Sequence, residues 1–162
     1  MSEPKSGAIV SVIVVYERTP WQDRFNEPTP YQLRCGLPEM SAKLFDRMRS
    51  RLRDLDGIEE GVAWYGVCWR WAIEFRLDDD ADPLAILIPS PDDLQFAMLL
   101  DPAFITSLPL RRMKRVVRDG LDLASEPFDT RWGVWSIQQD SVAEDLEDLA
   151  ARRRRHLIEQ GA

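Results

Sequence analysis

The sequence predicts a single α+β domain in which an antiparallel β-sheet has helices packed mainly on one face. The strand-like segments are grouped in the middle of the chain, and helical segments precede and follow them. A strict alternation of strands and helices, which would indicate a parallel sheet, is not present. The chain has 162 residues, which is enough for one sizeable core but would leave two full domains small.

The N-terminal part is expected to form a strand followed by an extended connection. Ile9–Tyr16 reads IVSVIVVY, and such β-branched residues pack well on a pleated sheet but lose χ1 freedom in a helix. Residues 19–38 contain four prolines, each of which removes a backbone donor and disfavours helix before it. We therefore assign residues 1–24 to a strand and its connection. The strand could pair within one chain or across a homodimer.

Three helices are expected from the spacing of apolar residues. Residues 39–55 carry an apolar stripe, and Gly57 follows as a stop signal. Pro109–Gly120 has one apolar face and a proline suited to the first turn. A last helix is expected to open with a capping box formed by Ser141 and Glu144, and to end near the run Arg152–Arg155, where cations complement the helix dipole.

Four strands are expected in the middle and near the end of the chain. The clearest is Val67–Leu77, where apolar and polar residues alternate and place Trp69 and Trp71 on one face. Two shorter strands and a last one complete the set: Leu84–Ile88, Leu94–Leu100 and Arg131–Ile137.

Residues 25–158 resemble the YdhG-like domains of unknown function. The resemblance is carried by Glu27-Pro28-Thr29, Trp64-Tyr65-Gly66, Trp69-Arg70-Trp71, Pro89 and the helix–strand–helix ending. Such domains are small bacterial α+β proteins that are grouped with YjbR-like and frataxin-like folds. The resemblance implies the fold and, through the likeness to frataxin, the handling of iron as one possible function. It implies no catalytic residues.

Charge and hydropathy exclude several classes of partner. The formal net charge of −7 makes a nucleic acid an unlikely partner, because nucleic acids attract basic surfaces. The longest apolar run, Ala8–Tyr16, is far shorter than the roughly 18 to 20 residues that span a bilayer, and Glu3 interrupts the basic leader that a signal peptide needs. Two cysteines are too few for a disulfide framework. We expect a cytoplasmic monomer or homodimer.

An aromatic-rich cleft is the first candidate site. Six tryptophans are many for a chain of this length. Trp132 and Trp135 lie three residues apart on the last strand and so point to opposite faces of the sheet, which means that at least one of them could leave the core. Together with polar neighbours they could line a pocket for a small molecule. The candidate ligand-binding residues are Tyr65, Arg70, Glu74, Trp132 and Trp135.

Glu74 could also act as a general acid or base in an enzyme without a recognisable motif. Arg70 and Arg76 are expected on the same face of the strand, and two nearby cations lower the pKa of a carboxyl group. A lowered pKa is unsuited to acid catalysis near neutral pH, so a salt bridge on a sheet surface is the favoured interpretation.

Basic residues on the helix after Pro109 are the second candidate site, for an acidic protein partner. The alternative is an ordinary solvated helix face opposite Leu110 and Val117. The candidate partner-binding residues are Arg111, Arg112, Lys114, Arg115 and Arg118, to which Arg152–Arg155 could contribute.

Metal and nucleophile sites are weakly supported. Asp78, Asp79, Asp80 and Asp82 could bind a hard cation, but acidic residues are common in turns and the spacing is not that of a calcium loop. Cys35 or Cys68 could act with His156 as its base, yet His156 follows four arginines and nothing in the sequence orients it. No cofactor is expected. The sequence thus favours a non-enzymatic ligand-binding or interaction module, with metal handling and an unrecognised enzyme as alternatives.

Overall fold

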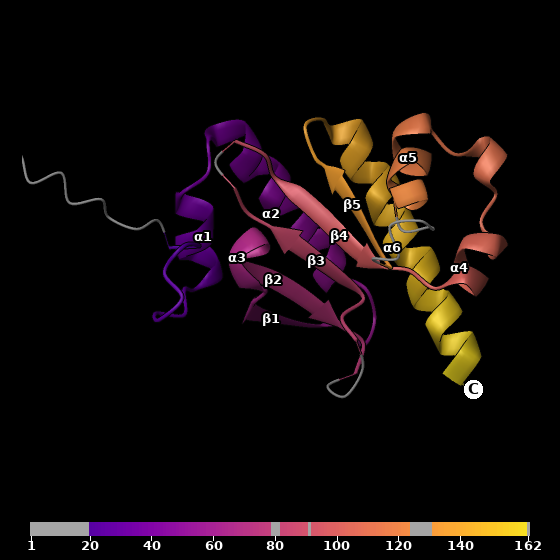
Figure 1. Ribbon diagram of the computed structural model, residues 1–162, viewed down its shortest axis with the longest axis horizontal. Coiled ribbons are helices and arrows are strands. Elements are labelled where there is room, and N and C mark those ends of the chain that lie inside the picture. Colours follow the sequence, from indigo (N-terminus) through magenta and orange to yellow (C-terminus); the bar gives the residue numbers. More distant parts are fainter. Residues whose placement is uncertain (1–19, 79–81, 91, 124–130, 162) are drawn as a thin grey trace, which may run out of the picture.

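A computed structural model describes residues 20–78, 82–90, 92–123 and 131–161, and the expected strand Ile9–Tyr16 lies outside them. Within these ranges the chain forms one five-stranded sheet with helices, which confirms the α+β class (Figure 1). The strands are β1 (Glu59–Trp64), β2 (Trp71–Arg76), β3 (Ala85–Ile88), β4 (Gln95–Leu99) and β5 (Trp132–Ser136).

The sheet is a meander in which each strand lies beside its neighbours in the chain. The order is β1-β2-β3-β4-β5, and every adjacent pair is antiparallel. β3, β4 and β5 fall within the segments expected from the sequence. The edge strand β1 was not expected, because Glu59, Glu60 and Gly61 are residue types depleted in strands.

Two long helices cover one face of the sheet, α2 (Glu39–Arg53) and α6 (Asp140–Gly161). They lie behind the sheet in Figure 1. The stripe of α2 that faces the sheet includes Phe45 and Met48, which are completely buried, as are Phe75 of β2 and Phe96 of β4. This helix face of the sheet holds the main core.

Helix α6 is joined to α2 by partly exposed ion pairs beside the core. Arg47 Nε lies 2.9 Å from Glu147, and Arg47 Nη1 lies 3.1 Å from Asp140. The expected capping box was wrong, because α6 begins at Asp140 and Ser141 is already its second residue. The expected end was also wrong, since Arg152–Arg155 lie well before the last turn, which is not basic.

The connection expected over residues 19–38 contains a short helix, α1 (Pro30–Cys35). Thr29 caps it, since its Oγ1 accepts from the Gln32 amide at 3.2 Å and the Gln32 side chain accepts from the Thr29 amide at 2.9 Å. Pro30 occupies the first turn, where a missing backbone donor costs nothing. A proline counted as a helix breaker therefore marks a helix start.

The helix expected over Pro109–Gly120 is broken into two. A 3-10 turn, η1 (Leu110–Arg112), is followed by Met113 in extended conformation and then by α5 (Arg115–Leu123). A further short helix, α4 (Pro102–Ser107), precedes them and was not expected. The Asp101 carboxylate caps α4 by accepting from the Phe104 amide at 2.8 Å.

Candidate functional site

The face of the sheet opposite α2 and α6 is only partly covered, and we call it the open face. Among the described elements, only the short helix α3 (Gly66–Trp69) lies over it in Figure 1. A second, smaller apolar cluster lies on this face. Its centre consists of four buried residues: Ala72, Ile86, Ile88 and Ala97. Four partly buried residues pack around this centre: Tyr65, Trp69, Trp132 and Val134.

Helix α3 interrupts the strand that was expected over Val67–Leu77. Gly66 and Arg70 both have positive φ, 84° and 58°, so the backbone turns sharply at each end of α3. The Tyr65 amide donates to the Arg70 carbonyl at 2.8 Å and closes this turn. As a result Trp69 packs on the open face while Trp71 packs in the main core, and the expectation that they share a face was wrong.

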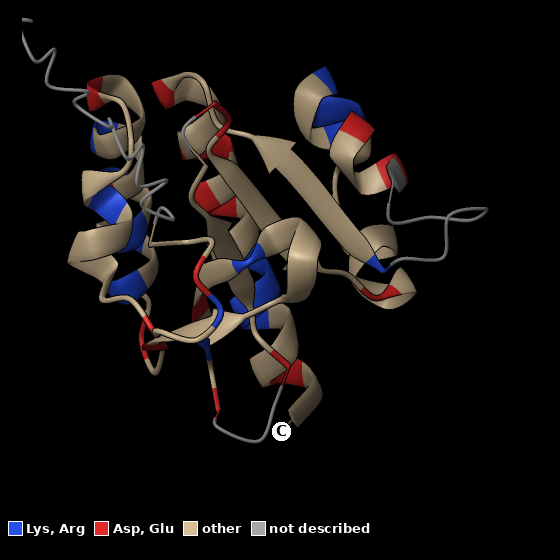
Figure 2. Ribbon diagram, turned by 60° about the vertical axis from the view of Figure 1, so that its left-hand side comes forward, with Lys and Arg blue, Asp and Glu red and all other residues tan. Residues whose placement is uncertain are grey.

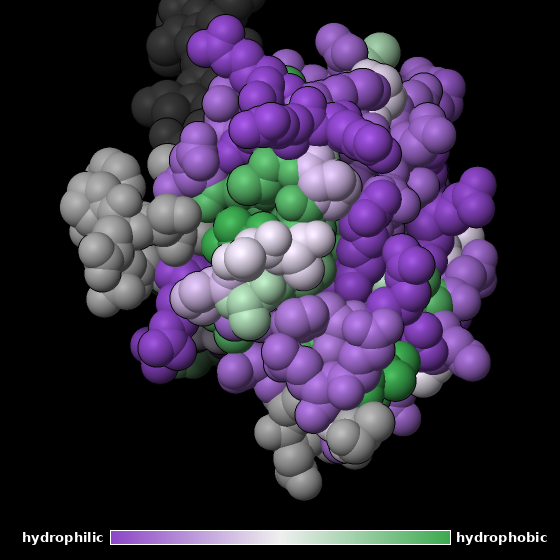
Figure 3. Space-filling model, turned by 90° about the vertical axis from the view of Figure 1, so that its right-hand side faces the viewer, coloured by the Kyte–Doolittle hydropathy of each residue, from purple (hydrophilic) through white to green (hydrophobic). Residues whose placement is uncertain are grey.

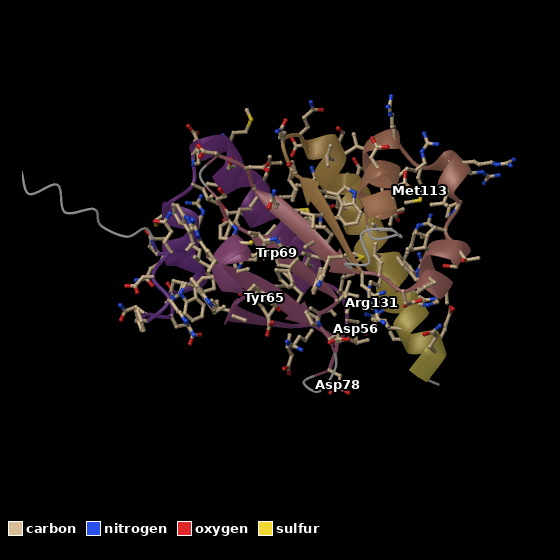
Figure 4. All side chains as sticks on the ribbon, viewed as in Figure 1. Asp56, Tyr65, Trp69, Asp78, Met113 and Arg131 are labelled. Atoms are coloured by element: carbon tan, nitrogen blue, oxygen red, sulfur yellow. The ribbon has the colours of Figure 1, made fainter. Side chains whose placement is uncertain are left out.

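Three aromatic rings meet on the open face. The rings of Trp69 and Trp132 lie 5.2 Å apart at 88°, an edge-to-face contact, although α3 and β5 are far apart in the chain. Tyr65 lies 6.1 Å from Trp69 on the other side. Figure 4 shows Tyr65 and Trp69 close together over the sheet. All three side chains are partly exposed, so aromatic ring surface, indole N–H groups and a tyrosine hydroxyl lie together at one place on the open face.

A hydrogen-bonded carboxylate lies beside these rings. Glu74 is on the open face of β2, opposite Gly61 and Ile86 in the neighbouring strands. Its carboxylate accepts from Arg76 Nε at 2.8 Å and from Arg76 Nη2 at 3.1 Å, and it also accepts from the Tyr65 hydroxyl. The salt bridge favoured over a catalytic role is therefore present.

The environment of this cluster fixes its protonation state at neutral pH. Burial raises the pKa of Glu74, but the hydrogen bonds from Arg76 and Tyr65 outweigh it, so the pKa is lowered overall. Burial and the hydrogen bond to Glu74 raise the pKa of Tyr65. Glu74 is thus ionised and Tyr65 protonated near pH 7. Neither group is suited to exchange a proton there.

The structure brings together three of the five expected ligand-binding residues: Tyr65, Glu74 and Trp132. Trp135 was wrongly placed, because it is 3% exposed on the helix face and its Nε1 donates to the Val117 carbonyl at 3.1 Å. Arg70 forms no hydrogen bond or ion pair with Glu74, since it ends α3 rather than lying on β2. Trp69 was missed as a site residue, and the glycine after Tyr65 was the signal for the turn that places it.

The expected basic surface is smaller than the sequence suggested. Lys114 pairs with Asp145 at 3.1 Å, and Arg115 lies 3.7 Å from Asp119. Figure 2 shows basic and acidic positions side by side on several helices. Of the four arginines of α6, Arg152 lies next to the basic segment, since it lines a hollow together with Arg112 and Lys114, but its Nε pairs with Asp148 at 2.9 Å.

One of those four arginines is buried, which no pattern in the sequence indicated. Arg153 is 5% exposed, with its Nη1 at 3.4 Å from the Asp101 carboxylate and its guanidinium over the Phe104 ring. His156 packs against Phe104, and its Nε2 lies 3.6 Å from Asp101. The expectation that nothing orients His156 was wrong. Its neighbours are Asp101 and Phe104 rather than a cysteine.

The acidic turn can be followed only in part. Asp79 and Asp80 lie outside the described residues, while Asp78 and Asp82 are exposed. The described ranges contain no group of three or more His, Cys, Asp or Glu side chains that could hold a metal ion. Metal handling stays a prediction of the sequence.

Comparison of the chain with protein-family models, with curated proteins and with solved structures gave no match. The resemblance to YdhG-like domains consequently stays a prediction as well. None of the helices in the described ranges combines the length and apolarity needed to cross a bilayer.

Proposed function

We propose that this protein is a non-enzymatic module that binds a small molecule on the open face of its sheet. The observation that supports this most is the contact between Trp69 and Trp132, which gathers partly exposed indoles from distant segments. Tyr65, which lies 6.1 Å from Trp69 and donates to Glu74, connects these indoles to the carboxylate. A flat apolar ligand could stack against the indoles while a polar group at its edge bonds to the Glu74–Arg76 pair. A fold of the YdhG-like group is part of the same proposal.

Binding is favoured over catalysis by the state of the polar groups. An acid or base that works at neutral pH needs a pKa near 7, whereas the pKa of Glu74 is shifted down and that of Tyr65 is shifted up. Such groups are better suited to orient a ligand than to transfer its protons. Cys35 and Cys68 are free and exposed, which supports a reducing compartment such as the cytoplasm as the place where the module works.

The test is a screen of metabolites by thermal shift, followed by titration of each hit while tryptophan fluorescence is recorded. A ligand on the open face should change the emission of the wild type, and the double variant Trp69→Phe/Trp132→Phe should lose that change and bind at least tenfold more weakly. The matched control is Trp135→Phe, which alters an indole on the opposite face of the sheet.

Circular dichroism must show that all variants remain folded. Hits that bind the double variant as tightly as the wild type would contradict the proposal, and so would conversion of a hit into a product by the wild-type protein.

A further inference from the structure

A second surface, away from the open face, combines a partly apolar hollow with unpaired cations. The hollow lies between α4, η1 and α5 and has a volume of about 430 Å³. Figure 3 shows an apolar area enclosed by hydrophilic residues on this side of the molecule. The hollow is lined by three apolar and four charged residues: Ile105, Leu110 and Leu121, with Arg115, Arg118, Asp119 and Asp122.

The apolar lining is partly accessible. Leu110 is 37% exposed, which is high for a leucine that lines a concavity, and Ile105 is partly exposed, while Leu121 forms the buried floor. A partner side chain that covered these apolar atoms would remove them from water. This would stabilise the complex by roughly 25 cal/mol for each Å² of apolar surface buried. The hollow would therefore accommodate a large apolar side chain from another molecule.

The segment that borders the hollow is basic, although the protein is acidic. Residues 110–122 contain five basic and two acidic side chains, whereas the whole chain has a net charge of −7. The lining itself is balanced, with Arg115 and Arg118 beside Asp119 and Asp122, so the excess positive charge comes from residues 111, 112 and 114, which follow Leu110 in the chain. Lys114 and Arg115 are neutralised by ion pairs. Arg111, Arg112 and Arg118 are exposed and form no ion pair within the part of the chain that the structure describes.

Taken together, these features identify the class of partner. A free anion would have no use for the apolar lining, and a nucleic acid would be repelled by the rest of a strongly acidic protein. An apolar side chain flanked by carboxylates satisfies both the hollow and the three arginines. We propose that the hollow and the three arginines dock an acidic, amphipathic segment of a partner protein.

This inference does not depend on the ligand of the open face. Figure 4 labels Trp69 and Met113, which lie in different parts of the molecule, one over the sheet and the other between η1 and α5. Failure of either proposal would leave the other intact.

The test uses a displayed library of random 16-residue peptides, selected on the full-length protein. The selected peptides should combine acidic residues with one or two large apolar residues. Their affinity should fall roughly tenfold or more for Arg111→Glu/Arg112→Glu/Arg118→Glu and for Leu110→Ser, and it should decline as salt is raised.

Two controls match these variants. Arg24→Glu/Arg51→Glu/Arg155→Glu makes the same change of net charge at exposed arginines elsewhere, and Val116→Ser shortens a half-exposed residue of α5 that does not line the hollow. Both should bind the peptides as the wild type does.

Three results would overturn the inference. The first is a selection that does not enrich acidic peptides. The second is a set of selected peptides that bind the arginine variant and Leu110→Ser as tightly as the wild type. The third is binding of phosphatidylserine vesicles or of duplex DNA that the arginine variant abolishes, because the surface would then serve a lipid or a nucleic acid.

Discussion

Replacing Gly120 by alanine should destabilise the protein, although alanine is the better helix former. Gly120 lies in the middle of α5 against the indole of Trp135, and a methyl group there would overlap ring atoms including Nε1. The indole cannot move away easily, because it is buried and its Nε1 donates to the Val117 carbonyl. The substitution must therefore displace either the ring or the helix.

The magnitude follows from three opposing effects. Alanine gains about 1 kcal/mol in helix propensity over glycine. Forcing extra volume into a packed core costs about 1 to 3 kcal/mol, and loss of a buried hydrogen bond costs about 1 to 2 kcal/mol more. The free energy of unfolding should thus decrease by about 1 to 4 kcal/mol, which lowers the melting temperature by roughly 3 to 12 °C for a domain of this size.

Urea unfolding followed by circular dichroism measures this difference, with Gly161→Ala as the control, since no atom lies within 4 Å of the added carbon there. The control should change stability by less than about 0.5 kcal/mol. In the Trp135→Leu background, Gly120→Ala should cost clearly less, because the ring atoms Nε1 and Cε2 that the added methyl group overlaps are gone. A Gly120→Ala protein as stable as the wild type would refute the reasoning.

Three further outcomes are expected. Asp101→Asn should lower the free energy of unfolding by about 2 to 4 kcal/mol, because it leaves Arg153 buried without its carboxylate partner. Arg153→Met removes the buried charge itself and should change the free energy of unfolding little. Equal losses of stability for the two variants in urea unfolding would contradict this. Glu74 has a folded pKa below its ordinary 4.5, so the stability that it contributes is complete above that value and is lost as the pH falls through the folded pKa. The Glu74→Gln protein should consequently be less stable than wild type at pH 7 and should approach it at pH 3, and a gap that is unchanged between these pH values would show the pKa argument to be wrong. Thr29→Ala removes the cap of α1 and should cost about 1 kcal/mol, whereas Thr29→Ser should retain most of the stability in the same assay.

The sheet was largely predictable because its central strands are apolar in sequence. β3 and β4 are buried on both faces, so uninterrupted apolar runs revealed them. β1 was not predictable in the same way. It is an edge strand that begins with Glu59 and Glu60. Glu60 pairs with Arg49 of α2 at 2.7 Å and lies 3.8 Å from Arg53, and these contacts exist only in the folded protein.

The candidate site shows where periodicity stops being informative. Apolar and polar residues continue to alternate through residues 67–77, yet the backbone is strand only from Trp71 onward. The two positive φ values that flank α3 reverse the side on which Trp69 lies. Only Gly66 hinted at this turn, and Arg70 adopts a conformation that its residue type disfavours. The contact between Tyr65 and Glu74 depends on the same turn.

The pairing of α2 with α6 has a consequence for synthesis of the protein. Arg47 and Glu147 are 100 residues apart, and Leu146 and Leu149 of α6 are completely buried on the helix face of the sheet. On the ribosome, α2 and most of the meander emerge long before α6 does. Until then the apolar side of the nascent sheet lacks the cover that α6 supplies, and it is exposed to aggregation or to a chaperone. Native packing becomes possible only when α6 has left the exit tunnel.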